Sequence, residues 1–155
     1  MNTFRRNILK GASGASAVAV AVAAGLVKPT EVMAAWNKSA FEAKTMDEAM
    51  KGVGATAPVD SKSITIKAPD IAENGAVVPV EVTSNLPGTT NISIFAEKNG
   101  TPLVGSYTFS NGTLGFVSTR IKMGTTSLVR AVVTAGGKSY TAAKEVKVTI
   151  GGCGG

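Results

Sequence analysis

The chain of 155 residues contains no histidine and only one cysteine, Cys153. The absence of histidine excludes imidazole-based catalytic triads and histidine metal ligands, and it removes the commonest general base. A single thiolate cannot complete a tetrahedral metal site, and a single cysteine cannot form an internal disulfide. These absences disfavour an enzyme and predict that the chain holds neither a metal nor another cofactor.

The first 34 residues have the organisation of an export signal. Arg5 and Arg6 open a basic segment, positions 11–27 carry no charge, and small residues follow around Ala34. A basic start, an apolar middle and a small-residue cleavage region are typical of a cleaved secretory signal. The paired arginines resemble the twin-arginine export motif, although Phe4 stands where that motif prefers Ser or Thr. We therefore expect residues 1–34 to be removed and the mature chain to be periplasmic.

A transmembrane anchor is the alternative interpretation of this leader, because 17 apolar residues nearly span a bilayer. The segment is rich in Ala, Gly and Ser, which partition weakly into lipid, so we expect no membrane association after cleavage. Removal of the leader also reduces the formal net charge from +6 to +3, since the mature part keeps 12 basic and 9 acidic residues. A charge this small, spread over the chain, forms no basic stripe, and nucleic acid is not an expected partner.

Residues 36–53 have helical periodicity, within a predicted N-terminal helical segment that covers residues 35–57. Apolar side chains recur near one face, and Ser39 and Glu42 have the spacing of a capping box. Gly52 is expected to help end the helix. The sequence leaves open whether this helix packs on the main domain or on a partner.

From Pro58 onward the apolar pattern has a period of two, and turn-forming pairs such as Asn-Gly, Pro-Gly and Gly-Gly separate the runs. Seven short strands separated by such turns predict an immunoglobulin-like antiparallel β-sandwich over residues 58–150, so the fold class is mainly β. Pro79 lies inside the second run and predicts an edge strand, because proline lacks the backbone N–H. The expected strands are 63–68, 77–83, 91–97, 104–109, 115–122, 127–134 and 139–150.

After Ile150 the chain ends in a pentapeptide that contains its only thiol, Gly151-Gly152-Cys153-Gly154-Gly155. Glycine adopts positive and negative φ almost equally, so we expect an arm of residues 151–155 with no preferred conformation. Extended, it would carry Cys153 roughly 10 Å beyond Ile150. An unperturbed thiol has a pKa of about 8.5, and no cationic residue adjoins Cys153 to lower that pKa. We therefore expect a thiol that other proteins must activate.

The twin-arginine-like leader, the helical segment, the predicted sandwich and the terminal pentapeptide together resemble the SoxY family, the sulfur-carrier subunits of the periplasmic thiosulfate-oxidising system. The pentapeptide is the specific part and matches at every position, whereas residues 36–150 are consistent only in length and character. The resemblance implies that Cys153 is the covalent attachment point for the substrate and that the chain has no catalytic residue. The carrier arm would be formed by Gly151, Gly152, Gly154 and Gly155.

The resemblance also implies several partners. A haem-containing enzyme would join thiosulfate oxidatively to Cys153, a hydrolase would then release sulfate, and in some organisms a molybdenum-containing dehydrogenase would oxidise the remaining sulfane. The carrier would form a heterodimer with SoxZ, a second β-sandwich subunit. The twin-arginine route exports folded proteins, so a partner without a leader would travel with the carrier.

Two other interpretations of the thiol stay open. Cys153 could form an intermolecular disulfide that links two chains into a structural dimer. Alternatively, the chain could be an exported β-sandwich binding module with an incidental tail. Sulfur adducts on the tail would support a carrier, only Cys153–Cys153 linkage would support the dimer, and unchanged function after deletion of residues 151–155 would support the binding module.

Overall fold

A computed structural model of the chain describes residues 37–110 and 112–150, so the leader with Arg5 and Arg6 and the pentapeptide with Cys153 lie outside the described residues. The described part contains two short helices and nine strands, and neither helix is long and apolar enough to span a membrane. The helices are α3 (Lys38–Glu42) and α4 (Met46–Gly52). The strands are β1 (Val59–Asp60), β2 (Ile64–Lys67), β3 (Ile71–Asn74), β4 (Val78–Ser84), β5 (Thr89–Ala96), β6 (Leu103–Thr108), β7 (Gly115–Ile121), β8 (Ser127–Ala135) and β9 (Lys138–Ile150).

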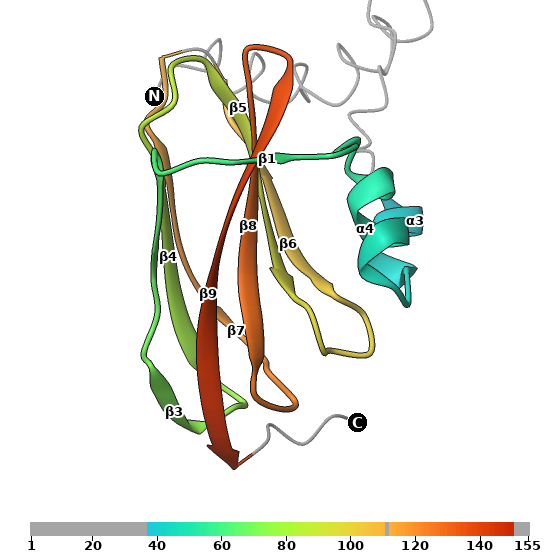
Figure 1. The fold of residues 1–155 in the computed structure, drawn as a ribbon, viewed down its shortest axis with the longest axis vertical. Helices are drawn as coiled ribbons and strands as arrows, with labels where there is room; N and C mark the ends of the chain where they lie inside the picture. The colour runs from blue at the N-terminus through green and yellow to red at the C-terminus, as the bar shows by residue number, and fades with distance from the viewer. Residues whose placement is uncertain (1–36, 111, 151–155) are drawn as a thin grey trace, which may run out of the picture. The chain divides into compact units, whose positions relative to one another are not determined.

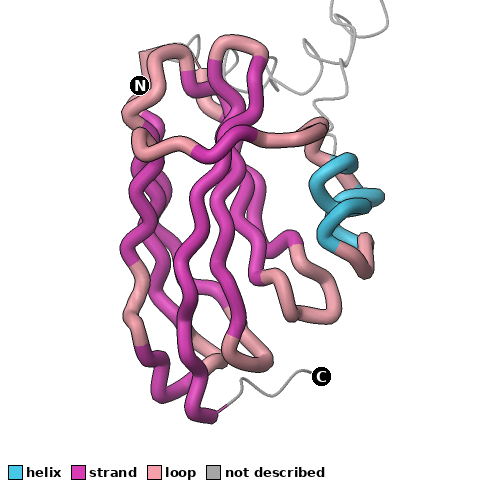
Figure 2. Tube along the Cα trace, viewed as in Figure 1, coloured by secondary structure: helices cyan, strands magenta, loops and turns pink. Residues whose placement is uncertain are grey.

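The strands form two facing sheets, which confirms the predicted β-sandwich (Figures 1 and 2). The larger sheet has the order β1-β9-β8-β5-β6, with β3 also paired to β9, and the smaller sheet has the order β2-β4-β7. The pairs are antiparallel except that β1 and β3 run parallel to β9. All seven predicted strands are present with small shifts at their ends.

Two strands, β1 and β3, were not predicted. They contain two and four residues, and the side chains of β1 are exposed while only Ala72 of β3 is buried. Neither segment shows the alternation that identifies a half-buried strand. Both are strands because their backbones pair with β9, which is a tertiary contact that the local sequence does not encode.

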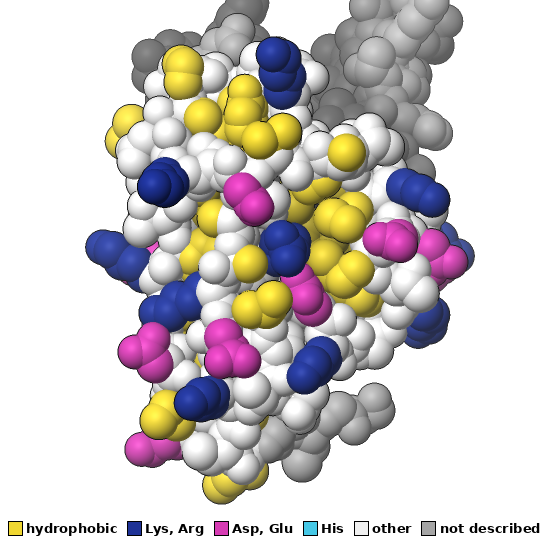
Figure 3. Space-filling model, viewed as in Figure 1, with side chains coloured by type: hydrophobic (Ala, Val, Ile, Leu, Met, Phe, Trp, Pro, Cys, Tyr) yellow, Lys and Arg dark blue, Asp and Glu magenta, His cyan; other side chains and the backbone are white. Residues whose placement is uncertain are grey.

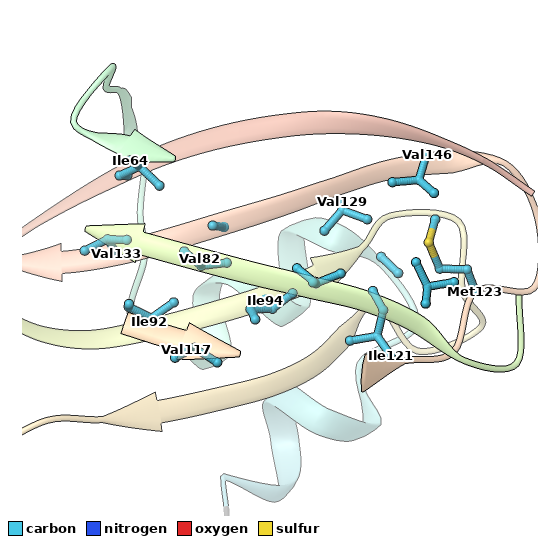
Figure 4. Close-up of a cluster of buried hydrophobic side chains, with 14 of the residues drawn as sticks. Ile64, Val82, Ile92, Ile94, Val117, Ile121, Met123, Val129, Val133 and Val146 are labelled. Atoms are coloured by element: carbon cyan, nitrogen blue, oxygen red, sulfur yellow. The ribbon is translucent and has the colours of Figure 1, made fainter. Parts of the chain in front are cut away.

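The core lies between the two sheets and consists of aliphatic side chains at every second position. In β4 the side chains of Val78, Val80 and Val82 are fully buried and alternate with more exposed ones. Figure 4 shows Val82 of the smaller sheet and Ile94 and Val129 of the larger sheet within this cluster. Burial of each such side chain stabilises the fold by roughly 1.5–3 kcal/mol.

The prediction that Pro79 marks an edge strand is wrong, because β4 is the central strand of the smaller sheet. The pairing between β2 and β4 ends at Lys67 opposite Glu81, two residues before Pro79 is reached. The N–H of Asn85 donates to Ser63 O at 2.9 Å, so odd-numbered residues of β4 direct their backbone groups toward β2. Pro79 lacks its N–H on that side, where β2 has already ended, and no ladder hydrogen bond is lost.

The prediction of one helix with a capping box from Ser39 to Glu42 is also wrong. Two helices form, and the chain is extended at Ala43 and Thr45 between them. Asn37 caps α3 by accepting from the N–H of Ala40, while Thr45 caps α4 by accepting from the N–H of Glu48. The sequence therefore contains a second capping pattern, Thr45-Met46-Asp47-Glu48, which starts a new helix and divides the predicted one.

The helices pack on this chain's own larger sheet, on the face opposite the sandwich core. Ala40 and Ala49 are fully buried in a second cluster with Phe95 of β5, and the cluster also contains Ala43, Ala55, Leu103 and Val132. Phe95 has no exposed surface although it points away from the main core. The helical segment thus covers one end of β5 and β6. It packs on its own chain, a point that the sequence left open.

Candidate functional site at the end of β9

The predicted carrier arm begins where β9 ends. β9 is the longest strand, with 13 residues, and its last residue is Ile150. Pairing with β8 ends at Val146 opposite Ser127, so residues 147–150 extend beyond that neighbour. Figure 1 shows β9 running to the lower end of the larger sheet and finishing beside β3. β3 pairs with this extension, with Ile71 opposite Lys147 and Asn74 opposite Ile150.

Hydrogen bonds hold the extension up to its final residue. The N–H of Gly75 donates to Ile150 O at 2.8 Å, and the hydroxyl of Thr149 donates to Glu73 O at 3.1 Å. On the side of β8, the N–H of Val148 donates to Thr126 Oγ1 at 2.9 Å. The described chain therefore stays bound to the sandwich until the residue that directly precedes Gly151.

β3 is itself fixed to the body of the protein. Ala72 is buried in the main core, and the carboxylate of Asp70, just before the strand, pairs with Lys144 Nζ at 3.0 Å. The N–H of Met123 donates to Gly75 O at 2.7 Å, and Met123 is fully buried. The strand that holds the end of β9 is thus anchored to both sheets.

The same end of the sandwich carries exposed apolar side chains. Ile71, Val77 and Ile150 are 58%, 53% and 69% exposed, and all three lie on β3, on the turn after it or at the end of β9. Elsewhere on the face seen in Figure 3, basic and acidic side chains are interspersed and form no continuous stripe of one charge. Three apolar side chains are therefore exposed near the last described residue, one of them its own.

A metal site and a ligand pocket are two further possibilities within the body of the sandwich. Within residues 37–110 and 112–150, no three acidic or thiol side chains gather closely enough to hold a metal ion. One pocket of about 350 Å³ lies between α4 and the larger sheet, where Arg130 Nε donates to Glu97 Oε1 at 2.7 Å. Thr141 also lines this pocket, and its hydroxyl donates to Ala131 O. Arg130, Glu97 and Thr141 therefore already bind protein atoms, and Asp60, Met46 and Met50 also line the pocket.

The predicted site residues Cys153, Gly151, Gly152, Gly154 and Gly155 lie outside the described residues, so their predicted roles stay predictions. The structure instead describes the strand that leads to them. The sequence did not predict that Glu73 and Thr126 contact this strand end, or that Thr149 binds Glu73. No local pattern could have found them, because they lie in three segments that only the fold brings together.

Comparison with known proteins identifies the family. Residues 49–153 match the family model described as sulfur oxidation protein SoxY, so the match ends at the only cysteine. The sulfur carrier protein SoxY from Chlorobium limicola f thiosulfatophilum has 47% sequence identity and a TM-score of 0.62, over 68% of this chain and 97% of that one. No curated protein sequence matches the chain.

A superoxide reductase (neelaredoxin) from Ignicoccus hospitalis aligns with 19% identity and a TM-score of 0.50, over 56% of this chain and 80% of that one. At that identity the likeness concerns the fold alone. The family match covers more than half of the chain and the Chlorobium protein is covered almost completely. This chain therefore belongs to the SoxY family of sulfur oxidation proteins.

Proposed function

We propose that the chain carries sulfur intermediates covalently on Cys153 and presents them to partner enzymes. The observation that carries this proposal is that the SoxY family match extends to residue 153, the only thiol in the chain. The position of Ile150 supports it, because the last strand is held to within three residues of that thiol. The chain supplies the attachment atom, and the catalytic groups belong to other proteins.

The loading step joins two sulfur atoms. The thiol of Cys153 and the outer sulfur of thiosulfate form an S–S bond, the thiol releases its proton, and two electrons pass to a haem-containing partner. An isolated thiol is only a few per cent thiolate near neutral pH, so the partner's active site has to deprotonate it. This requirement favours a thiol that can enter the active site of an enzyme. We expect the glycines on both sides of Cys153 to allow this entry.

The release step leaves one sulfur on the carrier. A water oxygen joins the sulfonate sulfur, the bond between that sulfur and the sulfane sulfur breaks, and sulfate leaves with two protons. The sulfane sulfur remains on Cys153 as a persulfide, which a sulfane dehydrogenase would oxidise further. On this proposal the hydrolase supplies the catalysis, and the carrier supplies only the sulfur atom that holds the substrate.

The proposal includes the partners and the compartment. We expect a heterodimer with a SoxZ-like β-sandwich subunit and export to the periplasm through the leader that contains Arg5 and Arg6. An arm of roughly 10 Å limits how far the enzymes can stay from Ile150. They therefore have to approach the end of the sandwich that exposes Ile71 and Val77.

Substitution of the attachment residue tests the proposal. Cys153→Ser exchanges one sulfur atom for oxygen, and we expect complete loss of thiosulfate loading with an unchanged thermal unfolding midpoint. The measurement is thiosulfate-dependent turnover in a system reconstituted from the carrier heterodimer and its enzymes, with wild-type carrier as the control. Retained turnover with Cys153→Ser would refute the role of the cysteine.

A further inference from the structure

The end of β9 is held by groups that the neighbouring strand β8 does not supply. Beyond Val146, residues 147–150 depend on β3 and on Thr126, the residue that precedes β8. A four-residue parallel pairing at the end of a sheet is a weak element, and such ends open locally more often than the core. Here three additional hydrogen bonds fall on the last three residues, from Gly75, to Glu73 and to Thr126.

We propose that Glu73, Gly75 and Thr126 form a clamp that fixes Val148, Thr149 and Ile150 and thereby positions the carrier arm. This inference rests on the proposed function of Cys153. The clamp residues are positioning residues, since the hydrogen bonds described for them go to the end of β9, through which they act. Their effect is to hold Ile150, the residue that directly precedes Gly151, on the sandwich.

The clamp determines how much chain a partner enzyme has to order. With the clamp closed, the thiol is three residues from the fixed strand, a reach of roughly 10 Å. With the clamp open, the last residue paired to β8 is Val146, and the thiol is seven residues away, a reach of roughly 23–25 Å. The four added residues include Lys147 and Ile150, whose side chains are too wide for a cleft that fits glycine. Ordering them on binding costs conformational entropy, so the enzyme binds the open carrier more weakly.

Two hydroxyls make the clamp testable without disturbing the core. Thr149 is exposed and Thr126 is half-buried, so substitution by valine keeps the shape of each side chain and removes only its hydrogen bond. Two hydrogen bonds of ordinary strength together shift a local closing equilibrium by roughly tenfold or more. Serine at the same positions keeps the hydroxyl and should restore the clamp.

The test uses the full-length mature carrier with its SoxZ-like subunit and the thiosulfate-joining enzyme. For the Thr126→Val and Thr149→Val double variant, we expect hydrogen exchange at the amide of Val148 to be about tenfold faster. The KM for the carrier should rise at least about threefold while kcat stays within about a factor of two, because the chemistry at the thiol is unchanged. The Thr126→Ser and Thr149→Ser double variant should behave as wild type in all three measurements.

Thr90 supplies a matched control. It is an exposed threonine whose hydroxyl donates to Thr134 O at 3.2 Å, the same kind of bond in a different part of the sheet. Thr90→Val should leave exchange at Val148 and the KM unchanged. Unchanged exchange at Val148 in the double valine variant, or faster exchange with unchanged KM, would overturn the clamp. If wild-type carrier is not loaded on Cys153 at all, the proposed function itself fails, which is a separate and recognisable result.

Discussion

Gly52 lies where helix α4 comes closest to α3. A Cβ atom at this position would be 2.6 Å from the Cβ and 2.7 Å from the Cα of Ala40, distances at which something must move. The side-chain amide of Asn37, the N-cap of α3, also donates to Gly52 O. The sequence suggested a role for this glycine in ending the helix, and α4 does end there, but its close contact with Ala40 is visible only in the fold.

Gly52→Ala should lower the free energy of unfolding by about 1–3 kcal/mol, because the added methyl forces the two helices apart. Denaturant-induced unfolding followed by circular dichroism provides the measurement. Gly100→Ala is the control, since no atom lies within 4 Å of the Cβ that it adds and its φ is ordinary. Equal effects of the two substitutions would contradict the described contact between α3 and α4.

The glycines of the predicted arm should matter for turnover rather than for stability. Gly152→Val or Gly154→Val stiffens the backbone and widens what an enzyme cleft must admit. We expect kcat/KM with the thiosulfate-joining enzyme to fall by roughly tenfold or more, because a misplaced thiol reacts slowly. The thermal unfolding midpoint should not change. If both variants have the same kcat/KM as wild type, glycine is not required at these positions.

At the scale of elements, the strands that the sequence predicted are those with many buried side chains. In β4 and in most of β8, buried residues alternate with more accessible ones, and the period-two pattern predicted both strands. β1 and β3 were not predicted, because each forms a strand through pairing with β9 and not through a pattern in its own sequence. The helical segment was predicted at the right place, but a second capping pattern at Thr45 divided it. The arm of residues 151–155 stays a prediction from the sequence, whereas the proposed clamp became visible only because the fold brings three separate segments together.

The docking of the helices on the larger sheet makes a prediction at this scale. Phe95 is fully buried on the helix side of β5, so Phe95→Ala should lower the free energy of unfolding by about 3–5 kcal/mol. Phe116 on β7 is 48% exposed and serves as the control, with an expected loss below about 1 kcal/mol on substitution by alanine. Equilibrium unfolding of both variants checks this. A small effect at Phe95 would mean that the helices do not cover the sheet in solution.

At the scale of the whole molecule, the buried clusters and the proposed attachment residue lie in different parts of the chain. The two buried clusters are built from residues between Ala40 and Val146, with partly buried neighbours as far as Val148. The only thiol comes five residues after that last neighbour. Under the proposed function, this separation in sequence would allow the sulfur group on Cys153 to change without a change in the buried clusters.

The most direct test of the account is the intact mass of the mature carrier isolated from cells that oxidise thiosulfate, followed by fragmentation of its C-terminal peptide. The account predicts sulfur-containing mass additions located on Cys153 and absent from the Cys153→Ser variant. A carrier found only as the free thiol or as a Cys153–Cys153 disulfide under these conditions would contradict covalent sulfur transport by this chain.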